Sequence, residues 1–412
     1  MTCYYIRRHL SNKIIKMRLS VIILLLVFVS CRKQDISPAP VGEAVDYNGP
    51  AASLNEVLEK SPYTYFNTAW KRAGMDAKLE ATGSKAFTLL APTDKAFQDA
   101  GWTMDKINNA TADELNDLLS YYVSAGNVLP ESLSLAFINI VLTSLKKSVD
   151  IPNYSADYPY TYLLFAGVHN DSLMINGKAV SKWGIALQSV TATIYPVDKL
   201  LPLPQMDMLT YLQSDERFSF YLEACRINDS LYLDAFPYDN GLLNLPLLSA
   251  MPGTGGQLTL FAPTNNAFKK SGFNSVEDIR EYSVRALPIG SPDLDADNYF
   301  VVPTSAMDSL LLPNRLDYAG IYGPGTGPRD MNMVYFENEL LDNGSSVSGL
   351  LIKQGSLYNN KSHIIRLDFS NSNGQVLVKR LGSDKPALPL ADKNIRVLNG
   401  VIHVVDEGLL MP

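Results

Sequence analysis

The sequence has few of the residues on which metal and thiol chemistry depend. Among its 412 residues there are only three cysteines and four histidines. It contains no His-Glu-x-x-His motif, no Gly-x-Ser-x-Gly nucleophile elbow and no phosphate-binding loop ending in Gly-Lys-Ser/Thr. Metalloproteases, α/β-hydrolases and P-loop enzymes are recognised by these patterns. We therefore predict a protein that is not an enzyme, with no catalytic residues, no metal and no cofactor.

Positive charge is also scarce. Charged residues make up 19% of the chain, and the formal net charge is −7. Nucleic-acid-binding proteins usually carry basic patches, and this acidic chain has no basic run beyond its first 20 residues. Hydrophobic residues make up 46% of the chain, which is enough to build buried cores. We expect a globular protein whose partner is not nucleic acid.

The first 30 residues contain no acidic residue and have the pattern of a signal peptide. Five basic residues between Arg7 and Arg18 precede an apolar run from Leu19 to Val29. A basic segment followed by a short apolar segment is typical of secretory signals. The run is too short for a transmembrane helix, which needs about 20 residues. Met17 is also a suitable start, so residues 1–16 are either an extended basic segment or not translated.

Cys31 follows the apolar run directly. Together with Phe28, Val29 and Ser30 it resembles the lipobox of bacterial lipoproteins, which implies cleavage before Cys31 and lipidation of this cysteine. The alternative is an ordinary secretory signal with an incidental cysteine. Cleavage would change the net charge from −7 to −12, because it removes five positive charges and no negative one. Residues 31–50 are predicted to be a flexible tether.

The rest of the chain contains an internal duplication. Residues 87–97 (FTLLAPTDKAF) recur as residues 258–268 (LTLFAPTNNAF), an offset of 171. A stretch that precedes residues 87–97 recurs at an offset of 155. A stretch that follows them, residues 194–202, recurs at an offset of 208. If residues 307–311 correspond to residues 115–119, a fourth offset is 192. Since the offsets rise along the chain, the second copy carries insertions.

The repeated motif predicts a strand-to-helix corner. Residues 87–90 alternate as a short buried strand. Thr93 is a suitable helix N-cap, and Asp94 then lies at the positive end of the helix. Phe97 falls where it can pack against the residue before the cap. Thr93 and its counterpart Thr264 are therefore interpreted as caps and not as nucleophiles.

These motifs resemble those of the fasciclin (FAS1) domain family. Residues 89–97 and 260–268 are similar to the first family motif, and residues 398–412 (LNGVIHVVDEGLLMP) to the second. Residues 194–202 (IYPVDKLLP) are a degraded second motif, with Tyr195 in the histidine position. Together with the lipobox, the chain resembles tandem-FAS1 lipoproteins of Bacteroidota. The resemblance implies an α+β fold of two tandem FAS1 domains, each a β-sandwich-like wedge covered by short helices.

The predicted organisation follows from these observations. We expect a lipoprotein signal peptide at residues 1–30, a tether at 31–50, FAS1 domain 1 at 51–204, and FAS1 domain 2 with loop insertions at 205–412. Hydrophobic spacing predicts helices and strands within both copies. The helices are expected at 53–72 and 111–123, and the strands at 160–166, 173–175, 188–197, 332–336, 348–352, 364–369 and 375–379. The insertions are expected as surface loops at 240–256, 287–303 and part of 320–329 or 343–361.

The remaining reactive residue types have ordinary explanations. Cys225 lies in an apolar stretch and is expected to be a small buried hydrophobe. His403 lies within a predicted strand, where a buried histidine is usually satisfied by the backbone. Animal fasciclin domains often carry a Tyr-His pair implicated in adhesion. At the matching place this chain has Tyr121 and Tyr122, so the resemblance does not extend to that activity.

Tyrosine, by contrast, is plentiful, with 22 in the chain. Four of them, Tyr154, Tyr158, Tyr160 and Tyr162, lie within nine residues. Exposed tyrosines can stack on sugar rings, so the four are candidate ligand contacts. The alternative, which we favour, is a β-hairpin whose tyrosines alternate between core and solvent.

Three Asp-Ser-Leu tripeptides resemble the O-glycosylation sequon of Bacteroidota. They would place glycans on Ser172, Ser230 and Ser309. Tripeptides also arise by chance, and Ser309 lies in a stretch that can form a helix. A mass shift at these serines in the native protein is the expected result, and its absence from all three would end the idea.

These features support a first hypothesis of a membrane-anchored lipoprotein that acts as a non-catalytic binding or adhesion module. Its partner would be a glycan or another cell-envelope protein, such as a transporter component. A second hypothesis is a structural accessory subunit of an outer-membrane uptake complex, with no ligand of its own. A third, a hydrolase, lacks a nucleophile–base constellation. We expect the lipid at the cell outer membrane, and the surface and periplasmic faces both remain open.

Overall fold

The computed structural model describes residues 49–151, 159–235, 257–284, 306–316, 333–342, 351–358 and 361–412. Residues 50–412 form one compact unit. Cys31, Tyr154 and Tyr158 lie outside the described residues, as do the predicted insertions at 240–256, 287–303 and 320–329. Among the helices of the described ranges, none is long and apolar enough to cross a membrane.

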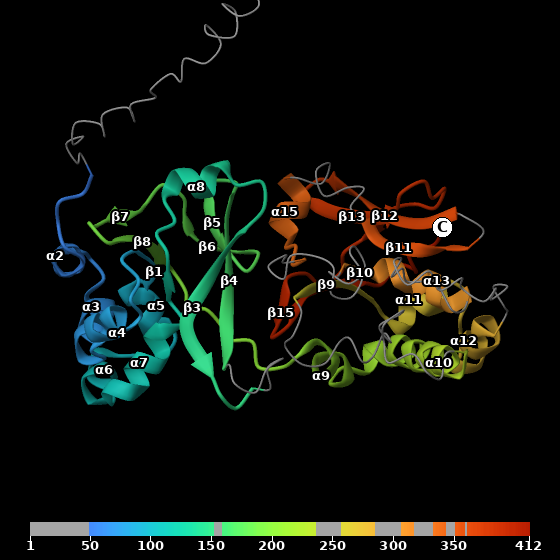
Figure 1. Ribbon diagram of the computed structural model, residues 1–412, viewed down its shortest axis with the longest axis horizontal. Coiled ribbons are helices and arrows are strands. Elements are labelled where there is room, and N and C mark those ends of the chain that lie inside the picture. Colours follow the sequence, from blue (N-terminus) through green and yellow to red (C-terminus); the bar gives the residue numbers. More distant parts are fainter. Residues whose placement is uncertain are drawn as a thin grey trace, which may run out of the picture. The chain divides into compact units, whose positions relative to one another are not determined.

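In the first half of the unit, residues 51–204, the short helices lie together on one side of the strands except for the last, α8 (Pro130–Leu135), which lies apart from them (Figure 1). Side chains start several of them. For example, the hydroxyl of Ser53 accepts from the amide of Glu56, whose carboxylate accepts in return from the Ser53 amide, which is a capping box. The helices are α2 (Leu54–Lys60), α3 (Thr64–Arg72), α4 (Met75–Ala81), α5 (Asp94–Asp99), α6 (Met104–Asn109), α7 (Ala112–Ser120) and α8 (Pro130–Leu135).

The strands of the first half form one sheet in the order β6-β5-β4-β3-β2-β1-β8-β7. All six residues of β1 are buried, because β1 lies inside the sheet, between β2 and β8, and the helices cover it. The strands are β1 (Phe87–Pro92), β2 (Val123–Ala125), β3 (Ile140–Ser148), β4 (Tyr160–His169), β5 (Ser172–Ile175), β6 (Lys178–Lys182), β7 (Leu187–Gln188) and β8 (Ala192–Val197).

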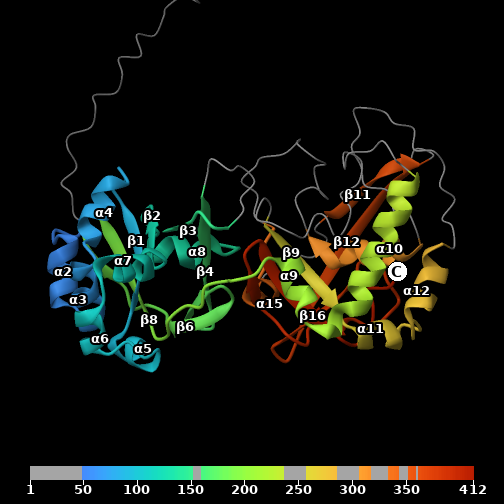
Figure 2. The ribbon, with the colours of Figure 1, turned by 90° about the horizontal axis from the view of Figure 1, so that it is seen from below.

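The second half, residues 205–412, has two sheets, in the orders β10-β9-β16-β15 and β11-β12-β13-β14. Its longest described helix, α10, packs against α11 and α12 (Figure 2). The helices are α9 (Met208–Gln213), η1 (Glu216–Phe218), α10 (Ser219–Ala235), α11 (Asn265–Lys270), α12 (Val276–Ser283), α13 (Ala306–Leu311), η2 (Leu312–Asn314) and α15 (Glu337–Asp342). The strands are β9 (Leu258–Pro263), β10 (Arg315–Leu316), β11 (Leu351–Tyr358), β12 (Lys361–Ser372), β13 (Gln375–Arg380), β14 (Leu388–Pro389), β15 (Ile395–Val397) and β16 (Gly400–Val405).

The strand register confirms the internal duplication. β1 pairs in parallel with β8, so that Phe87 lies opposite Ala192. β9 pairs in parallel with β16, so that Leu258 lies opposite Gly400. The residues of the second pair lie 171 and 208 positions after those of the first, as the sequence offsets require.

The other two offsets appear as repeated contacts. Leu89 of β1 lies opposite Val123 of β2, and Leu260 of β9 lies opposite Arg315 of β10, which is the offset of 192. The amide of Tyr65 donates to Asp94 at 2.9 Å, and the amide of Phe220 donates to Asn265 at 2.8 Å, which is the offset of 155. The two halves therefore repeat the same arrangement over their helices and their central strands.

The predicted strand-to-helix corner is confirmed in both halves. The hydroxyl of Thr93 accepts from the Ala96 amide at 3.2 Å, and that of Thr264 accepts from the Ala267 amide at 3.2 Å. Both threonines are helix caps. Phe97 is fully buried behind the first corner.

Most expected elements are present with adjusted ends. The predicted helix at 53–72 is two helices, α2 and α3, and the segment 188–197 is the hairpin of β7 and β8. The predicted strand at 332–336 is wrong for its described residues, 333–336, which join no sheet. These residues are buried, and the Tyr335 amide donates to the side chain of Thr259 at 2.9 Å.

Thr259 fastens this buried segment, and Thr88 does the same in the first half. The Thr259 hydroxyl donates to the carbonyl of Met333 at 2.6 Å while accepting from Tyr335. The Thr88 hydroxyl donates to the carbonyl of Gly126 at 2.7 Å and accepts from the Val128 amide at 2.9 Å. One hydroxyl thus satisfies two backbone groups that would otherwise be unpaired.

We expect Thr259→Val to lower the free energy of unfolding by about 2–3 kcal/mol, because valine keeps the shape but leaves a buried N–H and a buried C=O unpaired. Denaturant unfolding measures the change. Thr193→Val is the matched control, since Thr193 is equally buried and its hydroxyl has no hydrogen-bond partner among the described residues. The control is expected to be neutral or stabilising. Equal losses in the two variants would contradict the role given to the Thr259 hydroxyl.

Candidate functional site

A cavity of about 520 Å³ lies where three segments of the compact unit meet. This volume is within the range of small-molecule pockets, about 300–1,000 Å³. We call it the first cavity. It is lined by Ile175, Asn176, Lys178, Ala179, Val180, Lys199, Leu200, Leu201, Pro202, Leu203, Pro204, Lys393, Asn394, Ile395 and Arg396.

The turn between β5 and β6 forms the first wall. Asn176 and Gly177 both have positive φ, 51° and 73°, which is the conformation that Asn-Gly favours in two-residue hairpins. The Asn176 side chain accepts from the Phe165 amide at 3.0 Å. A Cβ on Gly177 would lie 2.6 Å from the side chain of Asn394, so the close approach needs glycine.

The segment after β8 forms the second wall, which is mainly aliphatic. It starts at Lys199 and contains Leu200, Leu201 and Leu203. The buried hydroxyl of Tyr122 accepts from the Leu201 amide at 2.7 Å. Tyr122, which occupies the place of the family's adhesion-linked histidine, thus holds this wall in position.

Residues 393–396, which lead into β15, form the third wall. Asn394 accepts from the amide of Glu337 at 2.8 Å and donates to the carbonyl of Gly177 at 2.9 Å. This one side chain therefore joins the third wall to the first. Asn394 also has a positive φ of 59°, which asparagine tolerates better than most residues.

The first cavity is positively charged. Lys178 and Lys199 are exposed, and neither forms an ion pair within the described residues. Lys393 pairs with Glu337, which does not line the cavity. Three lysines and one arginine therefore line the first cavity with no acidic side chain among the described lining residues, in a chain whose net charge is −7.

Arg396 is the most buried of these cations. Its Nη1 donates to the carbonyl of Gly400 at 2.7 Å and also to that of Val397, and the guanidinium interacts with the hydroxyl of Tyr160. Its guanidinium lies 5.2 Å from the ring centre of Phe165. Burial lowers the pKa of Arg396, and no carboxylate of the described residues pairs with it. A buried cation without a counter-ion favours the approach of an anion.

The lining of the first cavity is suited to hold an anion. The described residues that line it include cations, two asparagines and aliphatic side chains, and no serine, cysteine, histidine or acid. Elsewhere in the described residues no group of three histidine, cysteine or acidic side chains is placed to hold a metal ion.

Two of the candidate ligand-contact tyrosines lie in the core. Tyr160 and Tyr162 are 3% and 6% exposed, and the Tyr160 hydroxyl donates to the carbonyl of Leu398 at 2.7 Å. Their rings are 5.0 Å apart, edge to face. The expectation of exposed sugar-stacking rings is therefore wrong for these two, because their faces pack within β4 and its neighbours. Tyr154 and Tyr158 lie outside the described residues.

The other predicted site residues are scattered. Ser172 is half-buried at the start of β5, Ser230 is exposed on α10, and Ser309 lies in α13. The structure does not test glycosylation of these serines, nor lipidation of Cys31. Cys225 is fully buried in the core of the second half, as expected.

His403 is fully buried, and its Nε2 donates to the carbonyl of Tyr335 at 2.9 Å. Tyr195 occupies the same place in the first half, and its hydroxyl donates to the carbonyl of Val128 at 2.8 Å. Both side chains therefore satisfy a backbone carbonyl inside a half. This confirms the expectation of a buried, backbone-bonded histidine.

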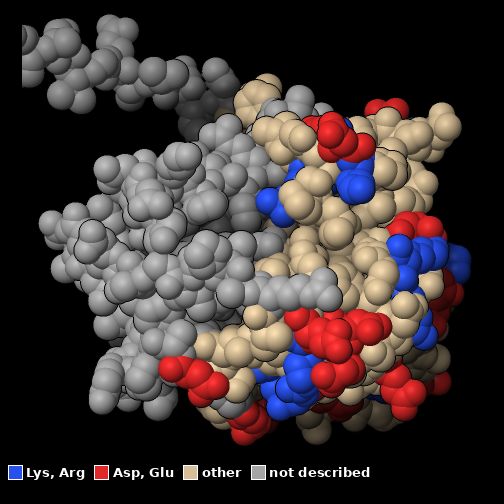
Figure 3. All heavy atoms as spheres, turned by 90° about the vertical axis from the view of Figure 1, so that its right-hand side faces the viewer, with Lys and Arg blue, Asp and Glu red and all other residues tan. Residues whose placement is uncertain are grey.

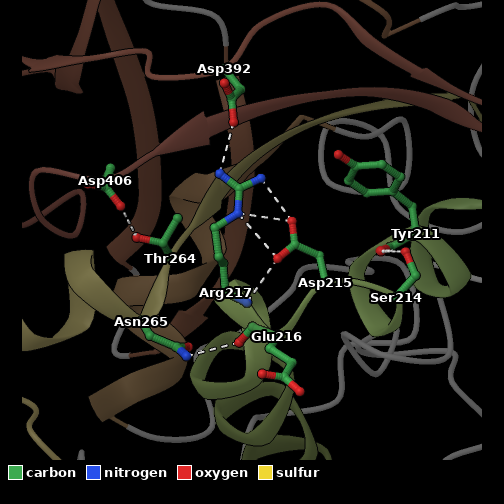
Figure 4. A network of polar contacts seen from close by, with 9 residues as sticks. All are labelled: Tyr211, Ser214, Asp215, Glu216, Arg217, Thr264, Asn265, Asp392 and Asp406. Atoms are coloured by element: carbon green, nitrogen blue, oxygen red, sulfur yellow. Dashed lines mark hydrogen bonds and ion pairs between the residues drawn. The ribbon is translucent and has the colours of Figure 1, made fainter.

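Outside the cavity, a polar network around Arg217 holds the start of α10 in place (Figure 4). The guanidinium donates to Asp215 at 2.8 Å and to Asp392 at 3.0 Å. Asp392 lies 175 positions after Arg217 in the chain, so the contact joins distant segments. Asp392 directly precedes the third wall of the first cavity. The neighbouring pairs, Thr264 with Asp406 and Asn265 with Glu216, join the corner to other loops. This network has a structural role, because it joins the start of α10 to segments far away in the chain.

The wider surface shows no comparable concentration of positive charge on the face in Figure 3, as far as its described residues are concerned. There, lysine and arginine side chains lie next to aspartate and glutamate side chains. Exposed pairs of this kind contribute little to stability and leave no large field of one sign.

Inspection of the sequence missed the first cavity because its walls come from residues 175–180, 199–204 and 393–396. The individual lysines look like ordinary solvated charges. One signal was available: the Asn-Gly pair at 176–177 predicts a tight turn. A second signal was Lys199, which lies in the degraded family motif at the position that Glu407 occupies in the second half.

The comparison with family models agrees with the family resemblance in the first half. The family model described as "Fasciclin domain" matches residues 52–204. A search of curated proteins found no match. A solved structure of a FAS1 domain pair from the insect cell adhesion molecule Fasciclin I is 12% identical to this chain, with 86% of this chain and 98% of that chain covered and a TM-score of 0.32. Residues 52–204 of this α+β chain form a fasciclin domain.

Proposed function

We propose that this protein is a lipid-anchored, non-catalytic binding module whose first cavity holds an acidic glycan. The observation that carries the proposal is the lining of that cavity: four cations, two asparagines and an aliphatic wall, with no acidic side chain among the described lining residues. Fasciclin domains are adhesion and binding modules, which is consistent with this role.

Two parts of the lining match parts of an acidic sugar. Lys178 and Lys199 are free to pair with carboxylates, in charge-assisted hydrogen bonds. The aliphatic wall at Leu200 and Leu201 suits the C–H face of a sugar ring, whereas the side chains of Asn176 and Asn394 hold the walls of the cavity in place. Small-molecule sites commonly combine an apolar surface with a few placed polar groups.

The test is titration calorimetry of the soluble fragment 32–412 with an oligogalacturonide, which carries one carboxylate on each sugar. We expect Lys178→Ala/Lys199→Ala to weaken binding at the first cavity at least about tenfold, since two charge-assisted contacts are lost. Lys60→Ala/Lys85→Ala is the matched control, because it removes two exposed lysines far from the cavity lining. No binding by the wild-type fragment, or equal weakening in the control, would overturn the proposal.

The lipid anchor is part of the proposal and has its own test. The signal-like segment and Cys31 predict a mature N-terminus at Cys31 that carries acyl chains. Mass spectrometry of the protein from membranes should find a lipid-modified Cys31 peptide. Cys31→Ala should move the protein into the soluble fraction. An unmodified mature N-terminus at another residue would contradict the anchor.

A second candidate, the accessory subunit of an uptake complex, rests on an apolar surface after α8. Leu135, Phe137 and Ile138 are 79%, 76% and 51% exposed. Apolar side chains gathered in this way often mark contacts with other proteins. Co-purification of an outer-membrane transporter, lost on Leu135→Ser/Ile138→Ser and unaffected by the first-cavity variants, would favour this function.

A further inference from the structure

A second cavity, of about 310 Å³, lies within the second half. It is bounded by the end of β13, the turn before β14, the end of α11 and the segment that follows β16. Its charged lining residues are Lys270, Lys379, Arg380, Lys385 and Glu407. Four cations thus face one carboxylate.

The two cavities occupy equivalent places on the duplicated fold. The segment 199–202, which follows β8, lines the first cavity, and the segment 407–410, which follows β16, lines the second. These segments are related by the offset of 208.

The opposite walls are equivalent as well. β4 and β5 form a hairpin in which His169 lies opposite Ser172, and β12 and β13 form one in which Ser372 lies opposite Gln375. The end of β5 lines the first cavity, and the end of β13 lines the second. The same pair of elements therefore forms two walls of each cavity.

The charges of the two cavities come from different positions. Lys199 of the first cavity corresponds to Glu407 of the second, by the offset of 208. Lys270 of the second corresponds to Asp99 in the first half, by the offset of 171. The positive lining is therefore not a by-product of one inherited lysine. The first cavity draws Lys178 and Lys199 from the first half and Lys393 and Arg396 from the second, whereas all four cations of the second cavity come from the second half.

Two of the four cations in the second cavity, Lys379 and Lys385, form no ion pair within the described residues. Glu407 pairs with Lys270 at 2.6 Å. Asp384, beside Lys385, is exposed. The two lysines can therefore make charge-assisted hydrogen bonds to a bound anion.

We infer that the second cavity is a second anion-binding site, related to the first by the duplication, and that the chain holds one acidic glycan-type ligand in each cavity. The inference takes its ligand class from the proposed function. The smaller volume suits a single acidic sugar residue, whereas the first cavity has room for more. Binding at two sites on one chain raises the avidity for a polymer with repeated carboxylates.

The experiment is calorimetry of the fragment 32–412 with a short oligogalacturonide, using stoichiometry as the readout. We expect two ligands per wild-type chain. Lys379→Ala/Lys385→Ala should leave one, with the affinity of the remaining site changed less than about twofold. Lys178→Ala/Lys199→Ala should also leave one ligand per chain, bound at the second cavity. The control Lys60→Ala/Lys85→Ala should keep two, and unchanged thermal unfolding midpoints should show that every variant is folded.

The outcomes separate this inference from the proposed function. One ligand per wild-type chain, lost only on Lys178→Ala/Lys199→Ala, overturns the second site and leaves the proposed function in place. One ligand lost only on Lys379→Ala/Lys385→Ala keeps the second site and overturns the role of the first cavity. No binding to the wild-type chain overturns both.

Discussion

Gly400→Ala is expected to lower the free energy of unfolding by about 3 kcal/mol or more, because the new methyl group has no space. Gly400 begins β16 and lies opposite Leu258 of β9 in the parallel pair at the centre of the second half. A Cβ there would lie 2.0 Å from the carbonyl oxygen of Leu258, which is backbone and cannot rotate away. Relief would require β9 and β16 to separate, which would weaken their ladder. Urea unfolding followed by tryptophan fluorescence and circular dichroism measures the loss.

Gly408→Ala is the matched control for this prediction. Gly408 has nearly the same φ as Gly400, 157° against 156°. The nearest atom to a Cβ there, the Ser271 hydroxyl oxygen, is 3.5 Å away, which is ordinary contact. Since the backbone strain is equal in the two variants, their difference reports the clash alone. A loss in Gly400→Ala no larger than in Gly408→Ala would contradict the close packing of β9 on β16.

Glu339→Gln is expected to reveal a pH dependence of stability that the wild type conceals. Glu339 is buried, and burial raises its pKa to about 7, although it accepts hydrogen bonds from the amides of Phe336 and Asn139 at 2.6 and 2.8 Å. Its ordinary value is 4.5. Between these values the folded state binds more protons than the unfolded state. The free energy of unfolding therefore falls, by about 2 kcal/mol, as the pH rises from about 5 to 7.

His403 has the opposite effect over the same window. Burial lowers its pKa from 6.5 to about 4, so the unfolded state binds more protons between these values. The contribution of His403 to the free energy of unfolding therefore rises, by about 2 kcal/mol, as the pH increases from about 5 to 7. The two contributions nearly cancel in the wild type.

The measurement is denaturant unfolding at several pH values between 5 and 7. The wild type should vary little, Glu339→Gln should become more stable toward pH 7, and His403→Gln should become less stable toward pH 7. Carboxylates whose pKa is lowered by hydrogen bonds, namely Asp215, Glu223 and Asp406, lose their contribution only below this window. Parallel pH profiles for the three proteins would contradict the burial of these two groups.

The sequence alone determined the features that depend on neighbouring residues. The corner motif predicted the caps at Thr93 and Thr264, because a threonine before a helical turn can satisfy the free amides of that turn. Hydrophobic alternation predicted β1, β4 and β5. The four offsets predicted which contacts of the first half recur in the second, since a duplicated chain keeps the pairings that bury its strands.

Only the tertiary structure decided which surfaces those elements share. Alternation along a strand does not say which face is covered, so Tyr160 and Tyr162 could not be assigned to the core from their spacing. Glu339 and Asn139 are 200 residues apart, and nothing in either stretch shows that they will be buried together. The two cavities depend in the same way on segments far apart in the chain. A lysine in a sequence looks like a solvated charge, and its role becomes visible only when folding places several cations around one cavity with fewer acids beside them.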